Sequence, residues 1–309
     1  MGSPERSGFV APTCWASPLD VAGLGPRETP FECVYSEAGM TLRRYTTRRT
    51  SKNPILLIVP APIKAAYIWD ATPSVSVVQR CIEGNCRVYP VEWARPDSSG
   101  PNLGLDDYTD RLLVKCLDVI QAETGEQSIF LTGHSLGGIF AAICAALHRQ
   151  RVAGLILLGT PLHFGPHVGP LDRLVAASPD AHVITSLMNT VPGSLLTVFS
   201  SLAAPESVIR FRWLDWLNSV PGPEALRTHL LVVRWTLDET PLTGRLFAEV
   251  VEYLYRGNCF MSGHLKISGR RARPDQVVAP LLSVVDKPCN LVPPEAILPF
   301  HYAVRSVDK

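Results

Sequence analysis

Ser128-Ile-Phe-Leu-Thr-Gly-His-Ser-Leu-Gly-Gly138 is the stretch of sequence that decides the fold. It begins with a short apolar run of strand length and contains the pattern G-x-S-x-G at Gly133–Gly137. The Ala-rich segment Leu136–Arg149 follows directly and is typical of a buried helix. The strand before the pattern and the helix after it make the pattern specific, because a tight turn between a strand and a helix exposes the serine hydroxyl above a sheet. The stretch therefore predicts a serine nucleophile on a strand-to-helix turn.

The residue types around Ser135 fit this chemistry. A nucleophile at the tip of a tight turn needs strained backbone angles and neighbours without bulky side chains, which Gly133, Gly137 and Gly138 provide. His134 is adjacent to the serine in sequence, and we expect it to line the pocket rather than to act as the base. The alternative interpretation is a glycine-rich turn that carries no chemistry.

Backbone N–H groups are the expected donors to a developing oxyanion. The positive end of the helix dipole lies at the start of the helix, so the N–H of Leu136 is one donor. The second donor is expected in the loop after the first buried strand, Pro60-Ala-Pro-Ile63. Because Pro60 and Pro62 have no N–H, Ala61 is the better candidate and Ile63 the weaker one.

Strands and helices alternate along most of the chain. Apolar runs of strand length predict strands at 55–59, 87–93, 128–132, 152–158 and 280–285, and helical spacing predicts a helix at 106–123. Two short edge strands are expected at 32–34 and 40–45. Strands separated by helices of this length indicate βαβ units and a mostly parallel sheet, which is the α/β fold class.

Three parts follow from this pattern. Residues 1–50 are rich in Pro, Ser, Gly and Arg and form an N-terminal extension. Residues 51–165 and 246–309 form the α/β core. Residues 166–245 carry Leu, Val and Trp in segments broken by prolines, without a clear strand, and are expected to form a helical cap inserted into the core. An apolar cap above a polar catalytic point suits an acyl chain, although ordinary packing against the core explains the same composition.

Composition and charge exclude several function classes. The net charge of +1 over 309 residues gives no basic surface for nucleic acid. The longest apolar runs are far shorter than the roughly 20 residues of a membrane span, and the N-terminus has no secretory signal. The eight cysteines include no CxxC pair, and free thiols fit the cytoplasm. With no metal-spaced cluster, nucleotide-binding glycine motif or P-loop, we expect neither a metal nor another cofactor.

Eight short motifs, the serine turn among them, extend the pattern along the chain. In chain order, the chain resembles the α/β-hydrolase-fold catalytic domain of polyhydroxyalkanoate synthases at Leu56–Pro60, Tyr67–Asp70, Gly84–Pro96, Leu105–Tyr108, Gly133–Gly138, Tyr253–Asn258, Gly269–Arg271 and Leu291–Pro294. The resemblance covers roughly residues 52–295. It implies an α/β-hydrolase fold with a cap and an acyl ester or thioester substrate, including an acyl-coenzyme A. It leaves a homodimer open as the oligomeric state.

Departures from that family decide the expected reaction. The synthases carry a cysteine where this chain has Ser135, and a serine favours ester or thioester hydrolysis over polymer growth. The family's Asp-His pair before "LVPP" is Cys289-Asn290 here. Asp286 lies three residues earlier, in the loop after the last predicted strand, and is the substitute acid; a solvated turn aspartate is the alternative.

The base is the weakest part of the expected triad. In this fold the order is serine, acid, histidine, and the family's histidine follows "VPP" by a few tens of residues. His301 is the histidine that follows Pro294 in this chain, and it is the candidate base; a packed or surface histidine is the alternative. We expect either a homologue shortened at its C-terminus or a degenerate site.

Three functions remain open at this point. The first is a serine enzyme that hydrolyses acyl esters or thioesters, including hydroxyacyl and polyester-like ones. The second is acyl transfer from a 3-hydroxyacyl thioester, as in the synthases. The third is a binding module that lacks a functional base, since a serine without its base keeps little of its rate enhancement.

Overall fold

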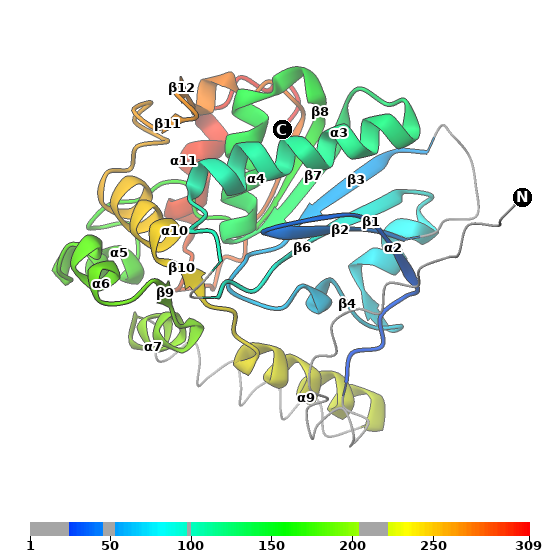
Figure 1. Ribbon diagram of the computed structural model, residues 1–309, viewed down its shortest axis with the longest axis horizontal. Coiled ribbons are helices and arrows are strands. Elements are labelled where there is room, and N and C mark those ends of the chain that lie inside the picture. The colour runs from blue at the N-terminus through cyan, green and yellow to red at the C-terminus, as the bar shows by residue number, and fades with distance from the viewer. Residues whose placement is uncertain (1–24, 46–52, 98–99, 204–221) are drawn as a thin grey trace, which may run out of the picture.

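The computed structural model describes residues 25–45, 53–97, 100–203 and 222–309 (Figure 1). Its centre is a seven-stranded sheet with the order β1-β2-β6-β3-β7-β8-β13. The strands are β1 (Phe31–Glu37), β2 (Met40–Tyr45), β3 (Ile55–Val59), β6 (Arg87–Trp93), β7 (Ile129–His134), β8 (Val152–Leu158) and β13 (Leu281–Val284). β6, β3, β7, β8 and β13 pair in parallel. β2 pairs antiparallel with β6 on one side and with β1 on the other. The predicted α/β class with a mostly parallel sheet is confirmed.

Continuous apolar runs made the central strands predictable. β3, β6 and β8 have the predicted bounds, while β7 begins one residue later than predicted and continues to His134. All five residues of β3 are buried, since helices cover both faces of the sheet. Residues 31–45 of the expected N-terminal extension supply β1 and β2 of this sheet. Residues 1–24 of that extension lie outside the described part of the chain.

Two hydrophobic clusters lie on opposite faces of the sheet. Leu57 of β3 packs in the larger cluster with residues of α3 (Leu112–Thr124) and α4 (Leu136–Leu147). Ile58, the next residue, packs in the smaller cluster with Val78 of α2 (Val77–Glu83) and Trp69 of η1 (Ala66–Trp69). Alternate side chains of one strand therefore hold two helical layers.

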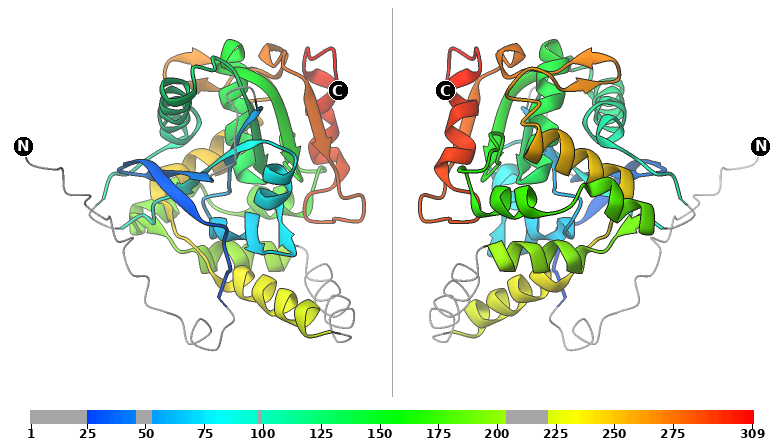
Figure 2. Two further views of the ribbon diagram at one scale, coloured as in Figure 1. Left: turned by 90° about the vertical axis from the view of Figure 1, so that its right-hand side faces the viewer. Right: turned by 90° about the vertical axis from the view of Figure 1, so that its left-hand side faces the viewer.

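Helices dominate the segment that we expected to be a cap. Its described helices are α5 (Pro170–Ala177), α6 (Ala181–Leu187), α7 (Gly193–Ala203) and α9 (Pro223–Leu237). A two-residue antiparallel pair, β9 (Thr190–Val191) with β10 (Leu242–Thr243), adds strands that the sequence did not predict. In both views of Figure 2, α9 lies at the bottom of the molecule, away from the C-terminus. Residues 204–221 lie outside the described part.

The remaining elements complete the core. A five-residue π-helix, η2 (Asp107–Arg111), leads directly into α3, and together they occupy the predicted helix. The others are β4 (Asp70–Thr72), β5 (Val75–Ser76), η3 (Arg149–Arg151), α10 (Gly244–Glu249), the π-helix η4 (Val250–Arg256), β11 (Lys266–Ile267), β12 (Arg270–Arg271), η5 (Pro274–Gln276) and α11 (Pro294–Ala303). Within the described ranges, no helix combines the length and the hydropathy that a membrane span needs.

Candidate active site

Ser135 stands at the turn between β7 and α4, as the sequence predicts. Its backbone has φ 52° and ψ −126°, and residues other than glycine rarely adopt a positive φ. The Ser135 N–H donates to the Leu158 carbonyl at 3.2 Å, and its carbonyl accepts from the Ile139 N–H at 3.2 Å. Strain of this kind persists only where the surrounding structure enforces it, and it is concentrated at functional sites.

Close backbone contacts explain the two glycines after the serine. A Cβ on Gly137 would lie 2.1 Å from the Val59 carbonyl oxygen and 2.5 Å from the Pro60 carbonyl carbon. A Cβ on Gly138 would lie 2.0 Å from Oγ1 of Thr160, in the loop after β8. The first turn of α4 is therefore pressed against the ends of two neighbouring strands, which brings the loop after β3 beside Ser135.

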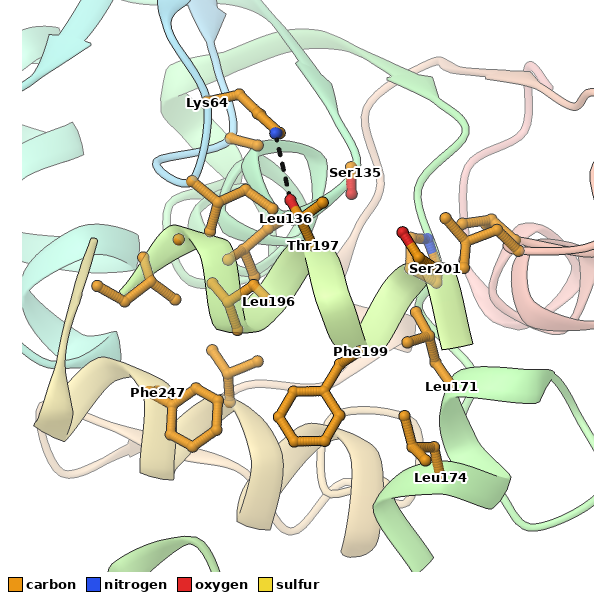
Figure 3. A pocket seen from close by; sticks show the side chains of 18 of the residues that line it. Lys64, Ser135, Leu136, Leu171, Leu174, Leu196, Thr197, Phe199, Ser201 and Phe247 are labelled. Carbon is orange, nitrogen blue, oxygen red and sulfur yellow. Dashed lines mark hydrogen bonds between the residues drawn. The ribbon is translucent and has the colours of Figure 1, made fainter. Parts of the chain in front are cut away.

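A cavity of about 830 Å³ begins at this turn and extends between the core and the cap helices (Figure 3). Five of the predicted site residues line it: Ser135, Leu136, Ala61, Ile63 and His134. Most of the remaining wall is apolar and comes from α5, α6, α7, α9, α10 and η4, including Leu174, Leu196, Phe199, Trp235, Phe247 and Val251. A pocket of this size and lining suits an apolar group that ends at Ser135.

Protein atoms around the imidazole of His134 reduce its hydration. The side chain keeps an open face toward the cavity, yet burial by its surroundings lowers its pKa below the ordinary histidine value. Because a neutral imidazole is then favoured at neutral pH, His134 offers the cavity a polar but uncharged surface. His134 thus lines the cavity, and its role in substrate binding stays a prediction.

Asp286 and His301 are placed differently from the other predicted residues. Asp286 is exposed in the loop after β13, and its carbonyl accepts from the N–H of Cys289 at 3.1 Å. His301 lies on α11, with Nδ1 3.1 Å from the Ser283 hydroxyl of β13. Neither belongs to the described residues that line the cavity. The structure does not bring them together with Ser135, and their roles as acid and base stay predictions.

Several further polar residues line the cavity and were not predicted as site residues, among them Lys64, Cys289 and His229. Lys64 lies three residues after Ala61, and its place directly after the expected oxyanion loop was a usable signal. Cys289 reaches the cavity from the loop after β13, at the position where the resembled family has its acid. His229 is buried on α9 and lines the cavity from the cap side, which no sequence pattern indicated. Among described residues, no group of three or more His, Cys, Asp or Glu could hold a metal ion.

Comparison with known proteins identifies the fold family of the chain. The family profile described as "alpha/beta hydrolase fold" matches residues 54–225, which is more than half of the chain. A poly(3-hydroxyalkanoate) polymerase subunit PhaC from Haloferax mediterranei is 30% identical over 292 residues, covering 93% of this chain and 59% of the relative. Its counterpart from Allochromatium vinosum is 27% identical and covers 90% and 79%. The chain thus spans less than two thirds of the length of the first of these relatives.

Among solved structures, the monoacylglycerol lipase of Paleococcus ferrophilus has a similar fold. It superposes with a TM-score of 0.53 at 17% sequence identity, over 87% of this chain and 86% of the lipase. At this identity the likeness concerns the fold alone. Taken with the parallel sheet, the family match shows that the chain belongs to the α/β-hydrolase fold family, and over most of its length its sequence is similar to polyhydroxyalkanoate synthases.

Proposed function

We propose that the protein is a serine enzyme that cleaves apolar acyl esters or thioesters through an acyl-enzyme on Ser135. The observation that carries the proposal is the position of Ser135, which lies on a strained turn at the wall of a largely apolar cavity of about 830 Å³. The hydroxyl supplies a nucleophile, and the cavity supplies room for the acyl chain.

The reaction proceeds in two steps. Ser135 Oγ attacks the acyl carbonyl, and the tetrahedral oxyanion accepts hydrogen bonds from the N–H groups of Leu136 and Ala61. The carbon–oxygen or carbon–sulfur bond then breaks, and the alcohol or thiol leaves with a proton. Water attacks the acyl-enzyme, releases the free acid and restores the serine. The base that takes the serine proton is proposed from the sequence to be His301, oriented by Asp286.

Acyl transfer is the second candidate, and the names of the relatives favour it. The Haloferax and Allochromatium proteins are named as poly(3-hydroxyalkanoate) polymerase subunits. In that case a 3-hydroxyacyl-coenzyme A is the donor, and the hydroxyl of another hydroxyacyl group replaces water as the acceptor. Serine in place of the cysteine of the synthases favours hydrolysis, since a histidine-activated serine is the usual nucleophile of ester hydrolysis and a thiolate suits the thioester exchange of polymer growth.

A fluorophosphonate probe tests the serine mechanism. We expect the parent protein to be labelled and the Ser135→Ala variant to lose both the label and its hydrolysis of p-nitrophenyl esters. Ser201→Ala is the matched control, since Ser201 lines the same cavity from α7 without standing at the turn (Figure 3). Labelling that survives in Ser135→Ala contradicts the proposal, and an unlabelled parent supports a non-catalytic binding module. With 3-hydroxybutyryl-coenzyme A, free acid identifies hydrolysis and oligomer identifies transfer.

A further inference from the structure

The loop after β3 is joined to the end of α9 by hydrogen bonds. The Trp235 indole N–H donates to the Ala65 carbonyl at 2.8 Å, and the Thr240 N–H donates to the Ile63 carbonyl at 3.2 Å. Farther along the same segment, the Tyr67 hydroxyl lies 2.7 Å from a carboxylate oxygen of Asp238. Residues 63–67 are thus hydrogen-bonded to residues about 170 positions later in the chain.

Lys64 is the side chain at the centre of this junction. Its Nζ donates to the Thr236 carbonyl at 2.5 Å and lies 3.4 Å from Oε1 of Glu239 and 3.5 Å from Oγ1 of Thr197 (Figure 3). The backbones of Lys64 and Glu239 also form an isolated antiparallel bridge. The two charged side chains are only 18% and 13% exposed, so water screens their attraction less than at an open surface. One ammonium group therefore holds α7, the end of α9 and the loop after β3 together.

The other end of the same loop is fixed to the core. The Trp93 indole N–H donates to the Pro60 carbonyl at 2.7 Å, and within the loop the Lys64 N–H donates to the Ala61 carbonyl at 3.4 Å. Ala61 lies between the attachment at Pro60 and the attachment made by the Lys64 side chain, and it is 8% exposed. The direction of its N–H depends on both, because a short loop held at two points has few backbone conformations left.

We propose that Lys64 is a positioning residue that sets the direction of the Ala61 N–H by tying its loop to α7 and α9. The proposal rests on the proposed function, since it assigns Ala61 to the oxyanion. Burial lowers the pKa of Lys64 while Glu239 opposes that shift, in agreement with an ammonium that is held by its neighbours rather than by water. Cap seating and oxyanion stabilisation are then coupled through one side chain.

Two ligands that share an alkyl chain separate this role from simple cavity binding. An alkyl trifluoromethyl ketone forms a tetrahedral adduct with Ser135 and needs the oxyanion donors, whereas the alcohol of equal length fills only the cavity. In Lys64→Met we expect ketone inhibition and kcat to weaken about tenfold, less than the 10²–10³ of a deleted donor, while alcohol binding stays within about twofold of the parent. Lys64→Arg should recover most of the loss, since a guanidinium also donates to Thr236 and pairs with Glu239.

The control variant and the parent are measured with the same ketone and alcohol. Arg80→Met removes an exposed cation that pairs with Glu83 on α2 and should change neither ligand. Equal ketone inhibition in the parent and Lys64→Met overturns the proposal. A parallel loss of ketone and alcohol binding also overturns it, because Lys64 would then serve the cavity rather than the loop.

Hydrogen exchange tests the coupling without any reaction. The amides of Ala61 and of residues 63–67 should exchange at least about tenfold faster in Lys64→Met than in the parent or Arg80→Met, because local opening becomes easier when the junction is cut. Unchanged exchange overturns the positioning role even if the parent is an active esterase. Faster exchange in Lys64→Met, together with a parent that no fluorophosphonate labels, would instead leave the coupling standing and remove the proposed function.

Discussion

Gly138→Ala gives a sharp test of the packing around the serine turn. In the interior of a helix this change ordinarily stabilises a protein by about 0.5–1 kcal/mol. Here the new Cβ would lie 2.0 Å from Oγ1 and 2.8 Å from Cγ2 of Thr160, which is fully buried. Ordinary contacts begin near 3.4 Å, so the Thr160 side chain or the helix must move by more than 1 Å. Overpacking of this kind costs about 1–3 kcal/mol, so after the helix gain is subtracted we expect a net loss of about 1 kcal/mol.

A double-mutant cycle checks the cause of that loss. Thr160→Ala alone removes a buried hydroxyl, which lies 3.3 Å from the Leu158 carbonyl, and should cost about 1–2 kcal/mol. In the double variant the two losses should not add, because the truncated side chain makes room for the new methyl group. We expect a favourable coupling of about 1–2 kcal/mol, measured by urea unfolding followed by circular dichroism.

Gly137→Ala is the matched comparison for this cycle. Its Cβ would meet the backbone of Val59 and Pro60, which no side-chain truncation can relieve, so Thr160→Ala should not rescue it. A Gly138→Ala variant at least as stable as the parent would refute the reasoning. Strictly additive losses with Thr160→Ala would refute it as well, since the contact would then not be the cause.

Three further outcomes concern the cavity, a buried carboxylate and the candidate base. Leu174→Trp, on the α5 wall, should raise KM for dodecanoyl p-nitrophenyl ester by about tenfold and leave the acetyl ester unchanged, as steady-state kinetics on the two esters would show. Burial alone would raise the pKa of Asp110, but hydrogen bonds from His148 and other neighbours outweigh it and lower that pKa. Asp110→Asn should therefore lower the free energy of unfolding by about 1–3 kcal/mol at pH 7, and this loss should shrink as the pH falls below about 4. Urea unfolding at pH 7 and below about pH 4 measures both losses. His301→Ala should lose fluorophosphonate labelling with its fold intact, because the proposed base for Ser135 is then missing. Labelling that survives would show that another group takes the serine proton and that the ring serves its contact with Ser283 instead.

The sequence was most informative where local pattern and burial coincide. β3 reads as five apolar residues between prolines and is buried at every position, so its bounds were predictable. Ser135 was predictable because the glycines around it answer a steric need that operates within a few residues. Five of the seven predicted site residues line one cavity for the same reason: they belong to two loops at the ends of adjacent parallel strands.

Long-range contacts account for what the sequence did not indicate. The side chain of Lys64 meets Thr236 and Glu239, which are more than 170 residues away, and nothing local in the sequence specifies that pairing. His229 enters the cavity from a segment without a periodic strand pattern to orient it. Asp286 and His301 were placed by order along the chain, but order alone does not fix where a loop after an edge strand turns.

Trp235 has a consequence for how such a chain can change its substrate range. Its ring forms part of the cavity wall, and its N–H holds the Ala65 carbonyl of the loop after β3. A smaller residue at this position enlarges the cavity and also removes the hydrogen bond that holds the loop. Selection for a longer substrate at this wall therefore also changes the catalytic rate. Leu174 on α5 and Val251 on η4 line the same cavity from the other elements. Substrate range is freer to evolve, or to be engineered, on the α5 and η4 side than on the α9 side.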